Sequence, residues 1–242
     1  MGPELSVVVL CYRSGEAART FAAGIRQALL DAGIHDYQLV LVGNYVSGSA
    51  DTTPEVVRAL AAGDPRIVCS AVPKQGMMGW DMRSGLALAA GETLAVIDGD
   101  GQVLVEDLVR VYQLLRKQKL DLAKTYRRQR GDGLKRKLFS FVLNALVHLL
   151  FPGVRVRDIN AKPKILTRSA YERMTLHSTD WFIDVEMLIE AHRLGLRIGE
   201  IETEFLGLTG RRSFVRASAV FEFLRNLARY RMQGWGRGSE SP

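Results

Sequence analysis

Thr93-Leu94-Ala95-Val96-Ile97-Asp98-Gly99-Asp100-Gly101-Gln102 is the stretch of this 242-residue chain that decides its fold. Its first five residues form an apolar run typical of a buried parallel strand. The two aspartates follow directly, at the position where an open α/β sheet places its ligands, just beyond the carboxyl end of a strand. Because side chains alternate along extended backbone, Asp98 and Asp100 are expected to point to the same side.

This Asp/Gly segment has two interpretations. The two carboxylates and the amide oxygen of Gln102 form a cluster of hard oxygen ligands suited to Mg²⁺ or Mn²⁺, with the phosphate oxygens of a substrate completing the shell. Alternatively, Asp and Gly occur here because they favour a tight polar turn after the strand. The segment by itself leaves both interpretations open.

The residues before this segment alternate between apolar runs and amphipathic stretches. Strands are predicted at residues 5–12, 38–42, 66–70 and 93–97, and helices over 17–32, from 54 to about 62, and within 76–90. Beyond the aspartates, the pattern predicts a helix over 106–118 and strands at 121–126, 165–167 and 197–201, and residues 180–184 lead into a helix that runs to about 194. A β-α-β-α-β succession indicates a parallel sheet covered by helices. The predicted fold class is therefore α/β, with a mostly parallel sheet flanked by helices.

Composition places the chain among ordinary globular proteins. With 47% hydrophobic and 24% charged residues, it can fill a sizeable core. Cys11 and Cys69 lie in or beside apolar runs, which indicates buried thiols in a reducing compartment and not a disulfide framework or a zinc site. The sequence shows no N-terminal signal pattern and no apolar run near the ~20 residues that span a bilayer, so we expect a cytoplasmic protein.

The net charge of +7 is unevenly distributed along the chain. Residues 1–109 contain 7 Lys/Arg and 13 Asp/Glu, a net charge of −6, whereas residues 110–242 contain 26 and 13, a net charge of +13. An acidic first half suits a metal-binding pocket. A basic second half suits an anionic partner such as a phosphorylated substrate, a nucleic acid or an anionic membrane surface. A solvated basic face that only aids solubility is the alternative.

Two segments of the basic half bear on membrane contact. Residues 138–151 are apolar except for Ser140, Asn144 and His148, which form one narrow stripe on a helix. Fourteen residues are too few to span a bilayer, so this helix is either buried or rests in a membrane surface, and His148 is expected to be structural. Residues 215–232 predict a second amphipathic helix that packs either on the domain or on a membrane.

These segments define the predicted domain organisation. Residues 1–206 form the α/β domain, which includes the apolar helix 138–151. Residues 207–242 contain a basic loop, the C-terminal amphipathic helix and a flexible tail rich in Gly and Ser.

The order and content of its motifs make the chain similar to family 2 glycosyltransferases with the GT-A fold, a Rossmann-like α/β architecture. The closest resemblance is to the branch of dolichol- or polyprenyl-phosphate mannose synthase-like enzymes, and it covers roughly residues 5–206. The stretch from Val96 to Gln102 resembles the family's xxDADxQ motif. The resemblance therefore implies that Asp98, Asp100 and Gln102 bind the metal, with Asp98 on the nucleotide side.

The resemblance also implies a set of donor-binding residues. Residues 7–16 are similar to the family's VVIPAYNE, with Glu16 displaced by two positions. The VVDDGSxDxT motif is altered, so that Asn44 stands at or near the place of the base-contacting aspartate. Residues 74–92 resemble GKGxAxxxGxxxAxGD. The implied donor-binding residues are Tyr12, Glu16, Asn44, Asp51, Lys74, Gly76, Arg83 and Asp98.

Basic residues mark the expected acceptor site. Arg127 takes the place of the Arg in the family's DxVxGSR motif, and Arg136 falls where a second phosphate-binding Arg is expected. Residues 158–162 occupy the position of DxxSGFR, keeping the Asp and a basic end while the SGF core is replaced. The candidate acceptor-phosphate residues are Arg127, Arg136, Lys162, Arg211 and Arg212, and the candidate catalytic residues are Asp100, Asp158, Arg127 and Asp184.

The favoured hypothesis is an inverting glycosyltransferase that moves a hexose from a nucleotide-diphosphate sugar to a polyprenyl phosphate. It would act at the cytoplasmic face of a membrane as a peripheral protein, with Mg²⁺ or Mn²⁺ as cofactor. A phosphate acceptor is already ionised near neutral pH and needs positive side chains more than a general base.

Two alternatives come from different classes of function. Transfer to a sugar hydroxyl of a glycan or small molecule would need a base, for which Asp184 or Asp158 is a candidate. A non-catalytic membrane- or nucleic-acid-binding protein is a weaker alternative, because no nucleic-acid motif appears. A nucleotidyltransferase is disfavoured, since only Gly15 lies where a glycine-rich phosphate loop is expected.

Overall fold

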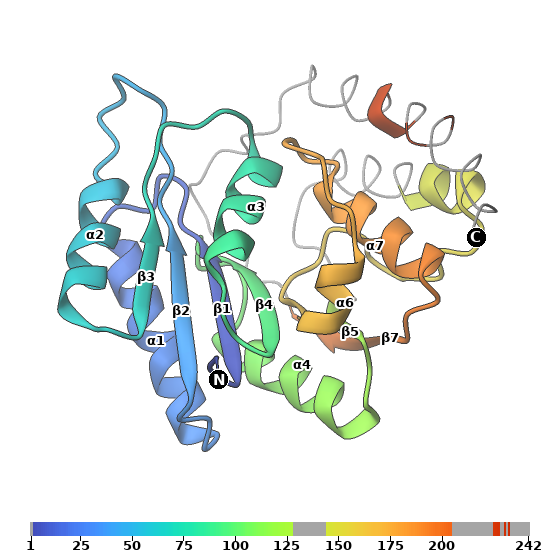
Figure 1. Ribbon diagram of the computed structural model, residues 1–242, viewed down its shortest axis with the longest axis horizontal. Helices are drawn as coiled ribbons and strands as arrows, with labels where there is room; N and C mark the ends of the chain where they lie inside the picture. Colours follow the sequence, from blue (N-terminus) through green and yellow to red (C-terminus); the bar gives the residue numbers. More distant parts are fainter. Residues whose placement is uncertain (1, 128–143, 205–224, 228–229, 231, 233–242) are drawn as a thin grey trace.

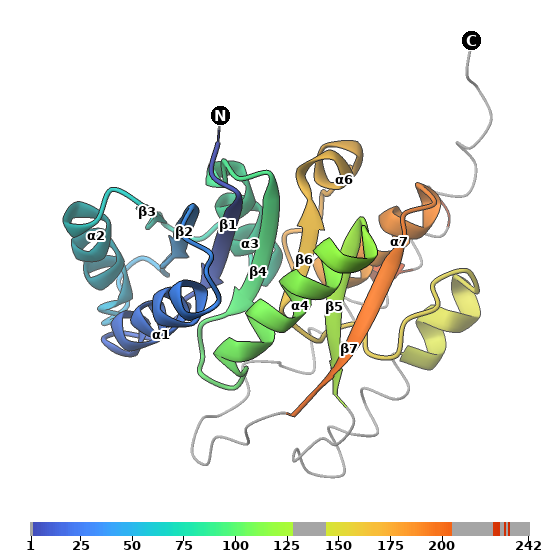
Figure 2. The ribbon, with the colours of Figure 1, turned by 90° about the horizontal axis from the view of Figure 1, so that it is seen from below.

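The computed structural model of the chain describes residues 2–127, 144–204, 225–227, 230 and 232. These residues form one seven-stranded sheet with helices on both faces (Figure 1, Figure 2). The fold class predicted from the sequence is confirmed.

The strands lie in the order β3-β2-β1-β4-β6-β5-β7. Their bounds are β1 Leu5–Leu10, β2 Tyr37–Val42, β3 Ile67–Ser70, β4 Thr93–Asp98, β5 Leu122–Arg127, β6 Lys164–Thr167 and β7 Ile198–Thr203. The first four strands are parallel, as are β5 and β7, whereas β6 runs antiparallel to both of its neighbours. The strands predicted from apolar runs are therefore present. The reversed direction of β6 is a feature that its short apolar run does not indicate.

Two apolar layers cover the sheet. One face packs against α1 (Ala17–Asp31), α2 (Thr53–Gly63) and α4 (Val105–Gln118), and the other against α3 (Met78–Leu88), α6 (Arg168–Arg173), α7 (Ile183–Arg193) and a helix at 144–150. The short α6 is not evident from periodicity. It begins directly after β6, where the hydroxyl of Thr167 accepts a hydrogen bond from the Ala170 N–H.

β1 and β4 lie side by side at the point where the strand order changes direction. β2 follows on one side of this pair and β6 on the other. The segments that leave the two strands are tied together, because the Gly99 N–H donates to the Leu10 carbonyl at 3.0 Å and Ser14 Oγ donates to the Gly99 carbonyl at 3.1 Å. Such a switch point opens a crevice at the carboxyl edge of a sheet, which places the Asp98 segment where ligands bind.

The polar stripe of the predicted apolar helix faces the protein. His148 Nε2 lies 3.0 Å from the Val156 carbonyl oxygen, and the Asn144 side chain accepts from the Ile159 N–H at 3.4 Å. Val147 is buried in the core, while Leu149 is 76% exposed. The structural role expected for His148 is supported by this contact. Residues 138–143 of the predicted helix, including Ser140, lie outside the described residues.

The described residues of the C-terminal segment pack on the domain. Leu227 is buried, the ring of Tyr230 lies 5.7 Å from that of Phe182, and the Tyr230 hydroxyl donates to Glu190 Oε1 at 2.7 Å. Asn226 donates to the Asp180 carboxylate. This part of the predicted amphipathic helix therefore directs one face at α7 and its preceding loop.

None of the helices in the described part of the chain is both long enough and apolar enough to cross a bilayer.

Gly85 allows α3 to approach the sheet closely. A Cβ atom at Gly85 would overlap with the side chains of Val8 and Val42, whereas one at Gly24 in α1 would lie 3.8 Å from Val105 Cγ2. We expect Gly85→Ala to lower the free energy of unfolding by about 1–3 kcal/mol through overpacking. Urea denaturation measures this. Gly24→Ala is the matched control and should raise stability by roughly 0.5–1 kcal/mol, since alanine is the better helix former. Equal effects of the two substitutions would contradict the close packing of α3.

Candidate active site

The Asp98 segment combines a turn with an exposed carboxylate. Asp98 is the last residue of β4, and Gly101 follows with a φ of +74°, a conformation that favours glycine. Asp100 Oδ1 accepts from the Gln102 N–H at 3.0 Å, which closes the turn. Asp100 thus has the turn role proposed for such residues, while the Asp98 side chain remains 35% exposed beside it.

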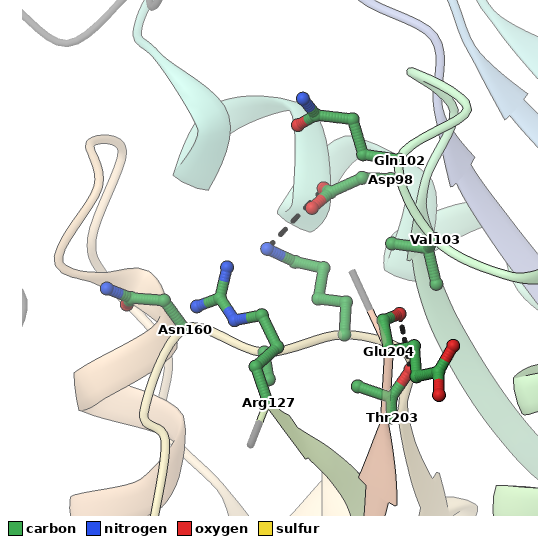
Figure 3. A pocket seen from close by; sticks show the side chains of 9 residues that line it. Asp98, Gln102, Val103, Arg127, Asn160, Thr203 and Glu204 are labelled. Atoms are coloured by element: carbon green, nitrogen blue, oxygen red, sulfur yellow. Dashed lines mark hydrogen bonds and ion pairs between the residues drawn. The ribbon is translucent and has the colours of Figure 1, made fainter. Parts of the chain in front are cut away.

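A small hollow opens beside this segment (Figure 3). Figure 3 shows Asp98 and Gln102 on one side of it and Arg127 and Asn160 on the other. The lining residues are Asp98, Gln102, Val103, Arg127, Asn160, Ala161, Lys162, Thr203 and Glu204. The hollow therefore brings together residues expected at the metal and at the acceptor phosphate. Asn160, Thr203 and Glu204 were not expected from the sequence, since they lie at element ends without a distinguishing pattern.

Lys162 connects the two sides of the hollow. Its ammonium lies 3.5 Å from Asp98 Oδ1 and 3.0 Å from Asp184 Oδ2, and its side chain is 2% exposed. Burial alone would lower the pKa of Lys162, but the nearby Asp184 and Asp98 carboxylates raise it above the ordinary value. Lys162 is therefore a fixed positive charge at the Asp98 carboxylate.

Asp184 lies between two lysines. Lys164 contacts one oxygen of its carboxylate and Lys162 the other. Burial opposes ionisation of Asp184, yet the two ammonium groups outweigh it and lower the pKa of this carboxyl. A buried carboxylate held in this way is poorly placed to take a proton from a substrate, so its location favours a positioning role over the general-base role considered above.

Two further lysines of the interior were missed by sequence reasoning. Lys124 and Lys164 pair across β5 and β6, and both are fully buried. Lys124 donates to the Thr125 carbonyl at 2.6 Å, to the Asp158 carbonyl, and to Glu200 Oε1 at 3.2 Å. Burial lowers the pKa of Lys124, and burial together with the Lys162 and Lys124 ammoniums lowers that of Lys164 to about 7 despite its contact with Asp184. The available signal was a lysine inside one predicted strand, Lys124 in 121–126, and a lysine directly before another, Lys164 before 165–167.

Arg127 projects into the hollow from the end of β5. Its guanidinium binds Asp158 in a bidentate manner, with Nε 2.6 Å from Oδ2 and Nη2 3.0 Å from Oδ1. The pair is largely enclosed, with side chains 13% and 6% exposed. Asp158 therefore fixes the plane of the guanidinium, and it is not positioned as a free carboxylate base.

Several residues predicted to bind the sugar-nucleotide donor belong to a second buried network of hydrogen bonds and ion pairs. The Asn44 amide donates to Asp81 Oδ1 at 3.1 Å and accepts from Ser70 Oγ at 2.8 Å and the Val72 N–H at 3.1 Å. Lys74 forms an ion pair with Asp81, and its ammonium lies 4.2 Å from the ring centroid of Tyr12. Asn44 is 1% exposed, so its side chain serves this network.

The other residues predicted to bind the donor make contacts with neighbouring residues of the chain. Glu16 is exposed and pairs with Arg19 at 3.0 Å. Asp51 Oδ1 accepts from the Thr53 N–H at 3.0 Å, while its buried Oδ2 has no hydrogen-bond partner among the described residues. Gly76 packs tightly against Thr179, and Arg83 donates to the His177 carbonyl at 2.9 Å. Gly76 and Arg83 thus contact the 177–179 segment.

Three of the predicted acceptor-phosphate residues, Arg136, Arg211 and Arg212, lie outside the described residues, as does most of the predicted 207–242 segment.

The oxygen ligands available at the end of β4 fit a hard divalent cation. Asp98 and Gln102 both line the hollow, and together with Asp100 they supply the carboxylate and amide oxygens that Mg²⁺ and Mn²⁺ prefer. The described part of the chain contains no group of three or more His, Cys, Asp or Glu side chains gathered for metal binding. Oxygens of a bound diphosphate would therefore be needed to complete the coordination shell.

Comparison with known proteins identifies the family. The profile of glycosyl transferase family 2 matches residues 6–180. The chain belongs to this family. Dolichyl-phosphate beta-glucosyltransferase ALG5A of Trichomonas vaginalis is 28% identical over 186 residues, which cover 72% of this chain and 55% of that protein. Dodecaprenyl-phosphate galacturonate synthase of Rhizobium johnstonii is 28% identical over 176 residues, which cover 72% of this chain and 50% of that protein.

The chain thus spans about half the length of these curated relatives. Their names agree with the resemblance to the polyprenyl-phosphate branch. Glucosyl-3-phosphoglycerate synthase from Mycobacterium tuberculosis, solved in complex with UDP, has the same fold, with a TM-score of 0.71 and 21% identity over 99% of this chain and 82% of that one. That synthase has also been solved with Mn²⁺ and UDP and with Mg²⁺ and UDP.

The lowered pKa of Lys164 predicts a pH-dependent stability. The unfolded chain keeps the Lys164 proton up to the ordinary pKa near 10.5, whereas the folded chain loses it near 7. The unfolded state therefore binds more protons between these values, and Lys164 makes stability rise with pH. Compared with Lys164→Met, the wild type should gain about 2 kcal/mol between pH 7 and 9. Urea denaturation of both proteins at the two pH values measures this, and a constant difference would refute it.

Proposed function

We propose that the chain is an inverting glycosyltransferase that transfers a hexose from a nucleotide-diphosphate sugar to a polyprenyl phosphate. It uses Mg²⁺ or Mn²⁺ and works at the cytoplasmic surface of a membrane as a peripheral protein. Membership of glycosyl transferase family 2 and the names of the relatives support the reaction class. The observation that carries the proposal is the hollow itself, which holds Asp98 and Gln102 close to Arg127 and Lys162.

This arrangement suits a reaction between two anions. The donor diphosphate and a polyprenyl phosphate both carry negative charge, and each needs positive charge to approach the other. A divalent cation at Asp98, Asp100 and Gln102 would act as a Lewis acid that stabilises the leaving diphosphate. Arg127 supplies a guanidinium on the opposite side, and its fork matches the geometry of a phosphate.

The side chains of the chain then position the reactants. Arg127, held in one plane by Asp158, orients the acceptor phosphate so that one of its oxygens faces the anomeric carbon. That oxygen forms the new bond to the carbon as the bond to the donor diphosphate breaks on the opposite face, which inverts the anomeric configuration. The acceptor oxygen carries no proton to remove, so no base is required.

The state of the acidic residues favours a phosphate acceptor over a sugar hydroxyl. Asp158 is bound to Arg127, and Asp184 is bound to two lysines, so both candidate bases are committed to cations. For a hydroxyl acceptor, Glu204 is the carboxylate of the hollow that would take over the role of base. A preference for the hydroxyl acceptor that depends on Glu204 would therefore favour the alternative function.

Location at a membrane surface is supported by exposed apolar side chains in the basic half of the chain. Leu149 is 76% exposed and Met232 is 78% exposed, although the helices that carry them pack on the domain by their other faces. Exposed apolar side chains in a basic part of a sequence suit the boundary of an anionic membrane.

The direct test is a donor and acceptor screen. The purified chain is incubated with UDP- and GDP-linked hexoses, Mn²⁺ and either a polyprenyl phosphate or the matching polyprenol, and glycolipid formation is measured. We expect transfer to the phosphate with one donor and none to the polyprenol. Transfer only to polyprenol or to soluble sugars would overturn the proposed acceptor.

Asp100→Asn should reduce transfer by about 100-fold or more, because leaving-group stabilisation of several kcal/mol depends on this carboxylate. The melting temperature should stay within a few degrees of the wild type, since asparagine also closes such turns. Initial rates over a range of Mn²⁺ concentrations measure the effect. Glu172→Gln, at an exposed carboxylate on α6, is the control and should keep full activity. Unchanged rates and unchanged Mn²⁺ dependence in Asp100→Asn would exclude a metal role for Asp100.

Arg127→Lys should weaken use of the lipid phosphate selectively. We expect the KM for polyprenyl phosphate to rise roughly 10- to 100-fold, because a lysine loses the bidentate contact while keeping the charge. The KM for the sugar nucleotide should change little. Steady-state kinetics with each substrate varied in turn separates these effects, and Arg116→Lys on the exposed face of α4 is the control. An increase confined to the KM for the sugar nucleotide would mean that Arg127 binds the donor and not the acceptor phosphate.

A further inference from the structure

Lys162 reaches the site from the opposite direction to the Asp98 segment. It lies just before β6, and its backbone is fixed because Thr125 Oγ1 donates to the Lys162 carbonyl at 2.8 Å. Its buried stem leads the ammonium to within 3.5 Å of Asp98 Oδ1 and 3.4 Å of Met78 Sδ. The ammonium is thus held beside Asp98, one of the expected metal ligands. Lys162 and Asp98 both line the hollow.

The Lys162 ammonium is shared between two carboxylates. It lies 3.0 Å from Asp184 Oδ2 and 3.5 Å from Asp98 Oδ1, and Asp98 lines the hollow with a side chain that is 35% exposed. A divalent cation that binds Asp98 therefore meets an ammonium already beside it, and a diphosphate entering the same hollow meets that same ammonium.

We propose that Lys162 is a built-in counter-charge for the diphosphate of the donor and so reduces the dependence of nucleotide binding on a divalent cation. The inference rests on the proposed function and names a donor role for a residue that the sequence assigned to the acceptor phosphate. Lys162 falls in the stretch where the chain departs from the DxxSGFR pattern. The ammonium shares the neutralisation of the diphosphate with a cation at Asp98, Asp100 and Gln102, and it remains in place when no cation is bound.

Calorimetric titration of the full chain with UDP and with GDP tests this directly. Each titration is performed in EDTA and again in Mn²⁺. The wild type should bind one of the two nucleotides in EDTA, and Mn²⁺ should tighten binding by less than about tenfold. Lys162→Met should weaken binding in EDTA by roughly 10- to 100-fold, the range expected for a lost hydrogen bond to a charged group, and Mn²⁺ should then recover much of the affinity.

Two variants control for charge and for folding. Lys117→Met removes a lysine from the exposed end of α4 and should bind as the wild type does. Lys162→Arg keeps a cation at the site and should retain most of the metal-free affinity. Lys162→Met leaves Asp184 paired with Lys164, so it should fold, and thermal unfolding in the same buffers verifies this.

Distinct outcomes separate this inference from the proposed function. Wild-type binding that appears only with Mn²⁺ overturns the role of Lys162 but keeps the glycosyltransferase proposal. Equal metal-free affinities of the wild type and Lys162→Met overturn it as well. If neither nucleotide binds in either buffer, both the inference and the proposed function fail. The wild-type comparison of EDTA with Mn²⁺ needs no variant, so it can refute the inference even if Lys162→Met does not fold.

Discussion

The buried carboxylate of Asp184 between Lys162 and Lys164 is the interaction on which the site depends. Removing an ion from water costs several kcal/mol, so such groups persist in an interior only when partners compensate them. Here one carboxylate from α7 holds a lysine of β6 and a lysine of the segment before it. The contact fixes a helix, a strand and a connection relative to one another, and it directs the Lys162 ammonium at Asp98.

The parallel half of the sheet could be predicted from the sequence because its elements are locally encoded. Apolar runs bounded by Gly, Pro and Asp specify β1 to β4, and the close pairing of β1 with β4 brings the Asp98 segment to the crevice. The Asp98 segment could also be singled out from the sequence, since Asp and Gly directly after a strand indicate either a tight turn or a ligand site. The turn interpretation is supported by the contact of Asp100 that closes the turn, whereas the ligand interpretation stays a prediction, with Asp98 facing the hollow.

The charged interior could not be predicted because it is set by contacts between distant residues. Lys124, Lys164 and Asp184 are separated by 20 to 60 positions, and the pairing of β6 with β5 and the packing of α7 bring them together. A lysine in a predicted strand gives no information about the carboxylate that it meets. The donor side shows the same limit, since Asn44 was assigned from its position to a ligand, whereas Ser70, Val72 and Asp81 engage its amide.

Because β6 is antiparallel, the residues of the site come from two kinds of position in the chain. The parallel strands contribute residues at or after their carboxyl ends, such as Asp98, Arg127 and Glu204, whereas β6 contributes the residues that precede its start, Asn160 to Lys162. Two different kinds of connection therefore meet in one hollow. The segment before β6 can change in length or content without shifting the register of the strand that carries Asp98. The segment before β6 can therefore be exchanged, by evolution or by a protein engineer, while the Asp98 segment on the other side of the hollow stays the same.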